Sequence, residues 1–139
     1  MIKKTKSSIL WNNQLSHKTV KYAGVHLIAE FWDGKNIDDK EEMEKLLVEA
    51  SKEANNTPLK VAVHKFWPQG IMGVVLLAES HIALHYWPEY NYLAVDIFTC
   101  GDHSQPEKAL EYLEKEIKPK KVEVKEIKRG ILSDEKDKK

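Results

Sequence analysis

The sequence predicts an α+β fold in which a mostly antiparallel sheet carries two helices on one face. Two apolar stripes at helical spacing lie among several segments that are rich in β-forming residues. Their order along the chain is strand, helix, four strands, helix, strand. If both helices pack on one face of the sheet, the apolar stripe of each helix is buried against it. The other face of the sheet then still needs to be covered. A second copy of the chain is one source of that cover.

The strands are predicted from runs of β-forming residues bounded by turn signals. The first run ends at Asp33-Gly34, and Pro88 with the Glu89-Tyr90-Asn91 turn separates two later ones. We expect the long apolar run that begins at residue 71 to divide near residue 80, because polar residues follow it. The expected strands are 24–32, 59–66, 71–79, 81–86, 92–99 and 121–128.

Each helix is predicted from a start signal followed by apolar residues at helical spacing. Asp38 and Asp39 precede Glu41 and Glu42, which predicts an N-cap and a capping box for a helix over 39–54. The run Ser104-Gln-Pro-Glu107 predicts a second capping box, with proline in the first turn of a helix that ends at Pro119.

Length and composition indicate one soluble globular domain. The chain has 139 residues, of which 42% are apolar and 32% are charged. We expect a loose arm over 1–20, a single domain over 21–132 and a charged tail over 133–139. Lysine plus arginine equals aspartate plus glutamate at 22 each, so nucleic acid and anionic membranes are not expected partners.

The single cysteine, Cys100, cannot form an internal disulfide. A reducing, cytoplasmic setting is therefore expected. No apolar run is long enough to span a bilayer, and Ile9-Leu10-Trp11 is too short for the apolar part of a signal peptide.

Groups that can handle protons are concentrated just after the apolar run, where Glu79, Ser80, His81, His85 and Glu89 follow one another closely. The two histidines are four apart, but in a β-rich segment that spacing does not aim both at one metal, so no metal site is expected. A serine hydrolase would need a glycine-flanked nucleophile, which Ser80 lacks. A triad with Asp96 remains open, and each residue taken singly is more often structural than catalytic.

Several separate motifs together resemble the prokaryotic S-adenosylmethionine decarboxylase family. The resemblance runs in one register from about residue 24 to about residue 130. The matching motifs are GVHLIAEF (24–31), HKFWPQG (64–70), GVVLLAESH (73–81), HYWPEY (85–90) and AVDIFTCGDHS (94–104).

The resemblance implies a two-layer α/β sandwich and a chain that cuts itself between Glu79 and Ser80. Ser80 would attack the preceding carbonyl, and β-elimination of the resulting ester would leave a pyruvoyl group on an α chain of 80–139, paired with a β chain of 1–79. In this family the pyruvoyl carbonyl forms a Schiff base with the substrate amine and accepts electrons during decarboxylation. The implied activity makes decarboxylated S-adenosylmethionine for spermidine biosynthesis, in a homodimer with sites at the subunit interface.

The resemblance also assigns roles to individual residues. His85 matches the proton acceptor in processing and Cys100 the proton donor in decarboxylation. Phe66 matches the aromatic that stacks on adenine, Glu89 the carboxylate that binds the ribose hydroxyls, and Glu30 an acid near the pyruvoyl group.

Two positions depart from the family pattern. Met72 stands where the family has a serine that assists self-cleavage, and its thioether cannot donate a hydrogen bond to a tetrahedral intermediate. Residues 72 and 80 share strand parity, so we expect them to face the same side. Tyr86 replaces a threonine and is expected to reshape the pocket. These departures keep two alternatives open, a decarboxylase of arginine or ornithine and a non-cleaving homologue that acts as a partner subunit.

Overall fold

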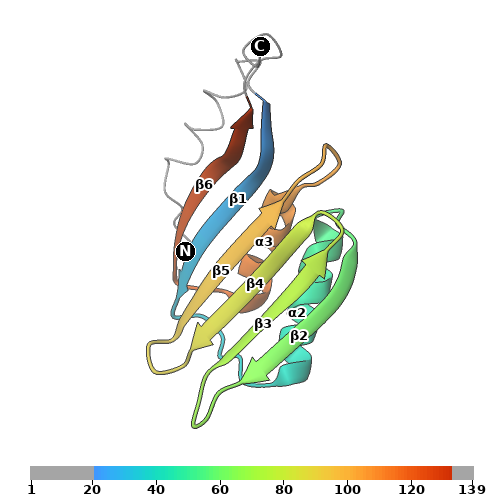
Figure 1. Cartoon of the computed structure of the whole chain (residues 1–139). Coiled ribbons are helices and arrows are strands. Elements are labelled where there is room, and N and C mark those ends of the chain that lie inside the picture. The colour runs from blue at the N-terminus through green and yellow to red at the C-terminus, as the bar shows by residue number, and fades with distance from the viewer. Residues whose placement is uncertain (1–20, 133–139) are drawn as a thin grey trace.

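The computed structural model describes residues 21–132, which form six strands and two helices (Figure 1). The predicted arm over 1–20 and tail over 133–139 lie outside the described residues. In chain order the elements are β1 (Lys21–Trp32), α2 (Lys40–Glu53), β2 (Pro58–Lys65), β3 (Ile71–Leu77), β4 (Ser80–Trp87), β5 (Tyr92–Thr99), α3 (Pro106–Ile117) and β6 (Lys121–Leu132).

The strands form one sheet in the order β2-β3-β4-β5-β1-β6, and every neighbouring pair is antiparallel. The predicted order of elements and the antiparallel sheet are therefore confirmed. The predicted division near residue 80 is also confirmed, although β3 ends at Leu77 rather than at 79. Ala78 and Glu79 form the turn between β3 and β4.

Both helices pack on the same face of the sheet, as Figure 1 shows and as the sequence predicts. The apolar stripe of each helix is buried against alternate strand residues, such as Phe31 of β1 and Ile82 of β4. The helical residues in this core are Met43, Leu46, Leu47 and Ala50 of α2 and Ala109, Leu110, Leu113 and Ile117 of α3.

The two helices begin differently. Asp39 is the N-cap of α2 as predicted, and its carboxylate accepts the N–H of Glu42 at 3.2 Å. The second predicted capping box is wrong, because Gln105 precedes α3 and makes no side-chain cap. The Ser104 hydroxyl instead accepts a hydrogen bond from Asn56 Nδ2 at 3.0 Å, in the loop after α2.

The other face of the sheet, which we call the open face, is covered by neither helix. Among its side chains is a continuous set of aromatic contacts across four strands. The ring centroids of His85 and Trp87 lie 3.8 Å apart, and those of Trp32 and Tyr92 lie 4.5 Å apart. The open face is lined by His26, Glu30, Trp32, His64, Met72, His85, Trp87, Tyr92, Asp96 and Phe98. Within 21–132 no helix is long and apolar enough to cross a membrane.

Two leucines provide a matched test of this packing. Leu47 of α2 is fully buried, whereas Leu59 of β2 is 65% exposed. We expect Leu47→Ala to lower the free energy of unfolding by about 2–5 kcal/mol, because it leaves a cavity between helix and sheet. Leu59→Ala should change it by less than about 0.5 kcal/mol. Urea titration at one protein concentration measures both, and equal losses would contradict the assigned layers.

Candidate active site

Ser80 is the first residue of β4, directly after the two-residue turn. Its φ of 142° lies far outside the region that suits a residue with a side chain. A residue other than glycine stays in such a conformation only where its surroundings hold it there. The peptide bond expected to be cut, Glu79–Ser80, is therefore attached to a strained backbone.

Cys100 makes two contacts with the carbonyl oxygen of that same bond. The Cys100 N–H donates to the Glu79 oxygen at 3.0 Å, and the Cys100 Sγ lies 3.2 Å from it. Cys100 lies beside this bond because it directly follows Thr99, the last residue of β5, which is the register partner of Ser80. The structure thus brings Glu79, Ser80 and Cys100 together, with two hydrogen-bond donors directed at one carbonyl oxygen.

Glu79 is buried, at 7% exposure of the whole residue, and its side chain lies among hydrogen-bond donors. Its carboxylate accepts the N–H of Thr57 at 3.0 Å and contacts the Thr57 hydroxyl at 3.4 Å and His103 Nε2 at 2.7 Å. Burial alone would raise the pKa of Glu79, but the donors from Thr57 and His103 outweigh it and lower that pKa.

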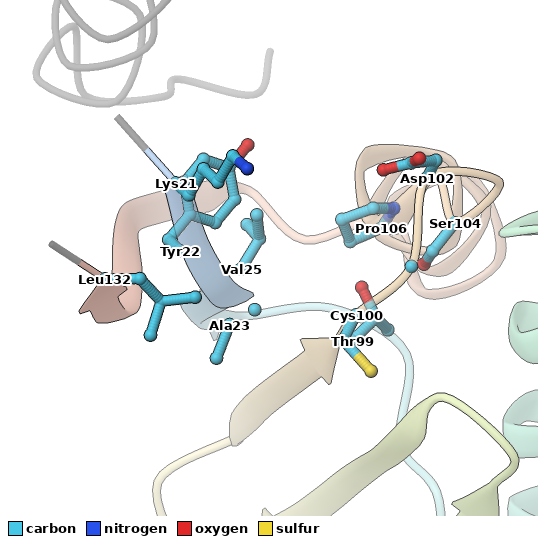
Figure 2. A pocket seen from close by; sticks show the side chains of 12 residues that line it. Lys21, Tyr22, Ala23, Val25, Thr99, Cys100, Asp102, Ser104, Pro106 and Leu132 are labelled. Carbon is cyan, nitrogen blue, oxygen red and sulfur yellow. The ribbon is translucent and has the colours of Figure 1, made fainter. Parts of the chain in front are cut away.

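A cavity of about 540 Å³ adjoins Cys100 and lies between the start of β1, the end of β5 and the start of α3. Figure 2 shows its lining, in which the Cys100 sulfur points away from Asp102 and Pro106. The thiol is directed instead toward the Glu79 carbonyl oxygen, which it approaches at 3.2 Å. Other residues that line the cavity include Lys21, Tyr22 and Ser104.

The remaining predicted site residues lie at the opposite end of β4. His85 is stacked between Trp87, at 3.8 Å between ring centroids, and Phe66, at 5.5 Å. Burial lowers the pKa of His85, so its imidazole is neutral at pH 7. Glu89 is exposed in the turn after β4, where its carboxylate accepts from Gln69 at 3.3 Å.

Glu30 belongs to this second group as well. Register places His64, Met72, His85, Ala94 and Glu30 in one row across five strands. The Glu30 carboxylate accepts a hydrogen bond from the Tyr92 hydroxyl. Burial and this carboxylate together raise the pKa of Tyr92, so the phenol keeps its proton.

The predicted site residues therefore form two separate groups in one chain. Ser80 and His85 are five positions apart on a straight strand, which separates their Cα atoms by about 17 Å. Glu79, Ser80 and Cys100 lie at one end of β4, whereas Phe66, His85, Glu89 and Glu30 lie toward the other. This separation also keeps the triad of Ser80, His85 and Asp96 from assembling within one chain.

Two expectations about the departures from the family pattern are wrong. Residues 72 and 80 do not face the same side of the sheet, because the chain reverses at Ala78-Glu79. Ser80 pairs with the core residue Leu77, whereas Met72 pairs with His85 on the open face. Tyr86 does not face the open side; it is 1% exposed in the core under the helices. Its hydroxyl contacts Asn36 and donates to Asn91 at 2.8 Å. Tyr86 thus gives no support for a different substrate.

Three contacts were missed at the level of sequence. One is the stacking of Trp87 on His85. Side chains alternate between the two faces of a strand, so residues 85 and 87 lie on the same face, and this alternation could have predicted the contact. No sequence signal links Thr57 or His103 to Glu79, because that contact depends on how two loops meet.

Within 21–132 there is no group of three or more histidine, cysteine, aspartate or glutamate side chains placed to hold a metal.

Comparison with known proteins relates this geometry to one family. The family model described as S-adenosylmethionine decarboxylase matches residues 25–130. A protein of Methanococcus maripaludis strain S2 named S-adenosylmethionine decarboxylase proenzyme is 48% identical over 117 residues, which are 83% of this chain and 96% of that protein. A proenzyme of the same name from Clostridium kluyveri is 44% identical over 111 residues, which are 78% of this chain and 88% of that protein.

A solved structure agrees with these relatives. The adenosylmethionine decarboxylase from Aquifex aeolicus superimposes with a TM-score of 0.77 at 38% identity, over 83% of this chain and 97% of that chain. The family match runs from within β1 to within β6 and contains every predicted site residue. The chain belongs to the S-adenosylmethionine decarboxylase family.

Proposed function

We propose that this protein is a pyruvoyl-dependent S-adenosylmethionine decarboxylase of the cytoplasm that supplies spermidine synthesis and that matures by cutting itself between Glu79 and Ser80. One observation carries the proposal. The Cys100 N–H and thiol both lie against the Glu79 carbonyl oxygen, next to a strained serine. The relatives are named proenzymes, which agrees with a chain that is made in an uncut form.

The first step needs only Ser80, Glu79 and Cys100. The Ser80 Oγ attacks the Glu79 carbonyl carbon and gives up its proton, and the carbonyl oxygen becomes an oxyanion. The Cys100 donors, at 3.0 and 3.2 Å, are placed to stabilise that charge. The C–N bond then breaks, the nitrogen of Ser80 takes a proton, and an ester joins Glu79 to the Ser80 oxygen.

The second step needs a base for the Cα proton of Ser80, and His85 is assigned this role. As the proton leaves, the Cβ–O bond of Ser80 breaks and Glu79 departs as a carboxylate that ends the β chain. The residue that remains takes up water and releases ammonia, which leaves a pyruvoyl group at the start of the α chain. A neutral imidazole suits this step, and burial keeps His85 neutral.

In decarboxylation the pyruvoyl carbonyl supplies the electron sink that a departing carboxyl group needs. The polar, strained turn beside Cys100 fits such a group, because the thiol lies 3.2 Å from the Glu79 carbonyl oxygen, directly before the residue from which the group would form. Cys100 holds the proton for the product carbon. Phe66 is 38% exposed and offers a ring face to adenine and to the sulfonium, and Glu89 offers two oxygens to the ribose diol.

The separation of the two groups of site residues supports a homodimer. His85 cannot reach Ser80 of its own chain across about 17 Å of strand. A two-fold arrangement that packs two open faces together, with their strands running in opposite directions, brings the His85 end of one copy over the Ser80 end of the other. The same packing covers the aromatic residues that the helices leave exposed.

Met72 bears on processing through His85. Because Met72 and His85 are cross-strand partners, both would reach the partner's Ser80 together. The thioether offers no hydrogen bond there, so Cys100 is left as the donor to the oxyanion. A chain in which Cys100 is not sufficient would remain uncut and act as a partner subunit.

Mass spectrometry of the purified protein tests this proposal. We expect two fragments, 1–79 and 80–139, in place of one chain of 16.1 kDa. The cut protein should release labelled carbon dioxide from carboxyl-labelled S-adenosylmethionine, and not from labelled arginine or ornithine. An uncut chain would instead support the partner-subunit alternative, and release from an amino acid alone would contradict the substrate.

Mixed dimers test the shared site. A Ser80→Ala chain and a His85→Ala chain should each remain uncut when expressed alone. When they are expressed together, half of the sites in a mixed dimer combine Ser80 of one copy with His85 of the other. We therefore expect cleavage of the His85→Ala chain, detected by a size tag on that chain. If it remains uncut in mixed dimers, His85 does not act across the interface.

The pH dependence of cleavage tests the role of His85. The base must be neutral, so the cleavage rate should fall as pH falls through the pKa of His85. Because burial lowers that pKa, the midpoint should lie below the usual value of about 6.5, and the rate should be level near pH 7. Timed samples on gels between pH 5 and 7.5 measure it. His81→Gln should keep the same midpoint, and a midpoint above 7 would count against the assignment.

A further inference from the structure

We propose that His103 is a positioning residue for self-cleavage. Together with Thr57 it holds the Glu79 side chain, and this contact, which we call the Glu79 latch, keeps the strained Glu79–Ser80 peptide beside Cys100. The inference rests on the proposed function, because it concerns the same bond. It adds a residue that touches neither the reacting atoms nor the substrate.

The latch is built from a buried acceptor and a half-exposed donor. The Glu79 side chain is 8% exposed and the His103 side chain 53% exposed, and Nε2 lies 2.7 Å from Oε2. An ionised carboxylate only accepts hydrogen bonds, so the Nε2 of His103 must carry the hydrogen. Thr57 adds its N–H to the other oxygen at 3.0 Å.

Glu79 is therefore held from both of its ends. Its side chain is bound by His103 and Thr57, and its carbonyl oxygen is bound by Cys100. With both ends fixed, the peptide plane between Glu79 and Ser80 cannot rotate to relieve the conformation of Ser80, whose φ is 142°. Release of the side chain would free that rotation and move the carbonyl away from its donors.

The position of His103 is itself fixed by contacts between two loops. Asn55 Nδ2 donates to the His103 carbonyl at 3.1 Å, and the Gln105 N–H donates to the Ala54 carbonyl at 2.9 Å. The His103 ring lies over Gly101, where a Cβ would be 3.0 Å from a ring carbon. Gly101, with φ of 96°, thus gives the ring room to reach Glu79.

The latch should matter before the cut and not after it. Once the bond is broken, Ser80 is no longer joined to Glu79, so the orientation of Glu79 no longer sets the geometry of the α chain's first residue. A merely structural role for His103 would lower activity and cleavage alike. The latch predicts a lower rate of cleavage with unchanged decarboxylation per cut chain.

Three variants of the full chain separate these outcomes. His103→Leu removes the donor, and His103→Gln replaces it with an amide N–H of similar reach. Lys108→Leu introduces the same apolar side chain at an exposed position in the first turn of α3. We expect His103→Leu to slow cleavage about tenfold, which corresponds to about 1.4 kcal/mol in the barrier. His103→Gln should be within about threefold of the parent rate, and Lys108→Leu should match it.

Timed mass spectra give the cleavage rate, and carbon dioxide release divided by the amount of cut chain gives the decarboxylation rate. Cleavage of His103→Leu at the parent rate would overturn the latch. The latch would also be overturned if His103→Gln were cleaved as slowly as His103→Leu. The same holds if decarboxylation per cut chain fell in parallel with the cleavage rate.

A second measurement keeps the latch testable if the parent chain does not cut itself, an outcome that would contradict the proposed function alone. In an uncut Ser80→Ala chain, carbon NMR follows the titration of the Glu79 carboxyl group. The latch predicts a midpoint below the ordinary glutamate value that rises when His103→Leu is added. An unchanged midpoint would overturn the latch whether or not the chain is an enzyme.

Discussion

The register of β4 within the sheet is the constraint on which the site depends. Antiparallel pairing with β3 and β5 fixes Ser80 opposite Leu77 and Thr99, and it fixes His85 opposite Met72 and Ala94. A straight strand then holds Ser80 and the proposed base, His85, about 17 Å apart, beyond the reach of any side-chain motion. One chain therefore carries both groups of proposed site residues, but it cannot bring them together.

Each half is organised by a different kind of interaction. At the Ser80 end, hydrogen bonds from Cys100, Thr57 and His103 fix a short turn in a strained form. At the His85 end, stacked rings hold the imidazole, and burial lowers its pKa. The first arrangement directs donors at a carbonyl, while the second offers a neutral base and an aromatic surface. The open face joins them, and its pairing with a second open face would complete the site.

Sequence patterns predicted the elements well because the signals were local. Alternation and helical spacing determine which side chains one face buries, and Asp39 capped α2 as its pattern indicated. The failures were at contacts between distant segments. Ser104 had the pattern of a cap, but Asn56 from another loop binds its hydroxyl. Tyr86 and Met72 were misjudged because parity along one run does not tell which face is covered or where a hairpin reverses.

In the proposed dimer, each site combines Ser80 of one copy with His85 of the other. The most direct measurement is an experimental structure of the Ser80→Ala chain, which cannot cut itself. We expect a two-fold dimer with open faces packed together. The His85 imidazole of one copy should lie within about 5 Å of residue 80 of the other, near hydrogen-bonding reach once the serine is restored. A monomer, or a dimer in which residue 80 lies far from the partner's His85, would contradict it.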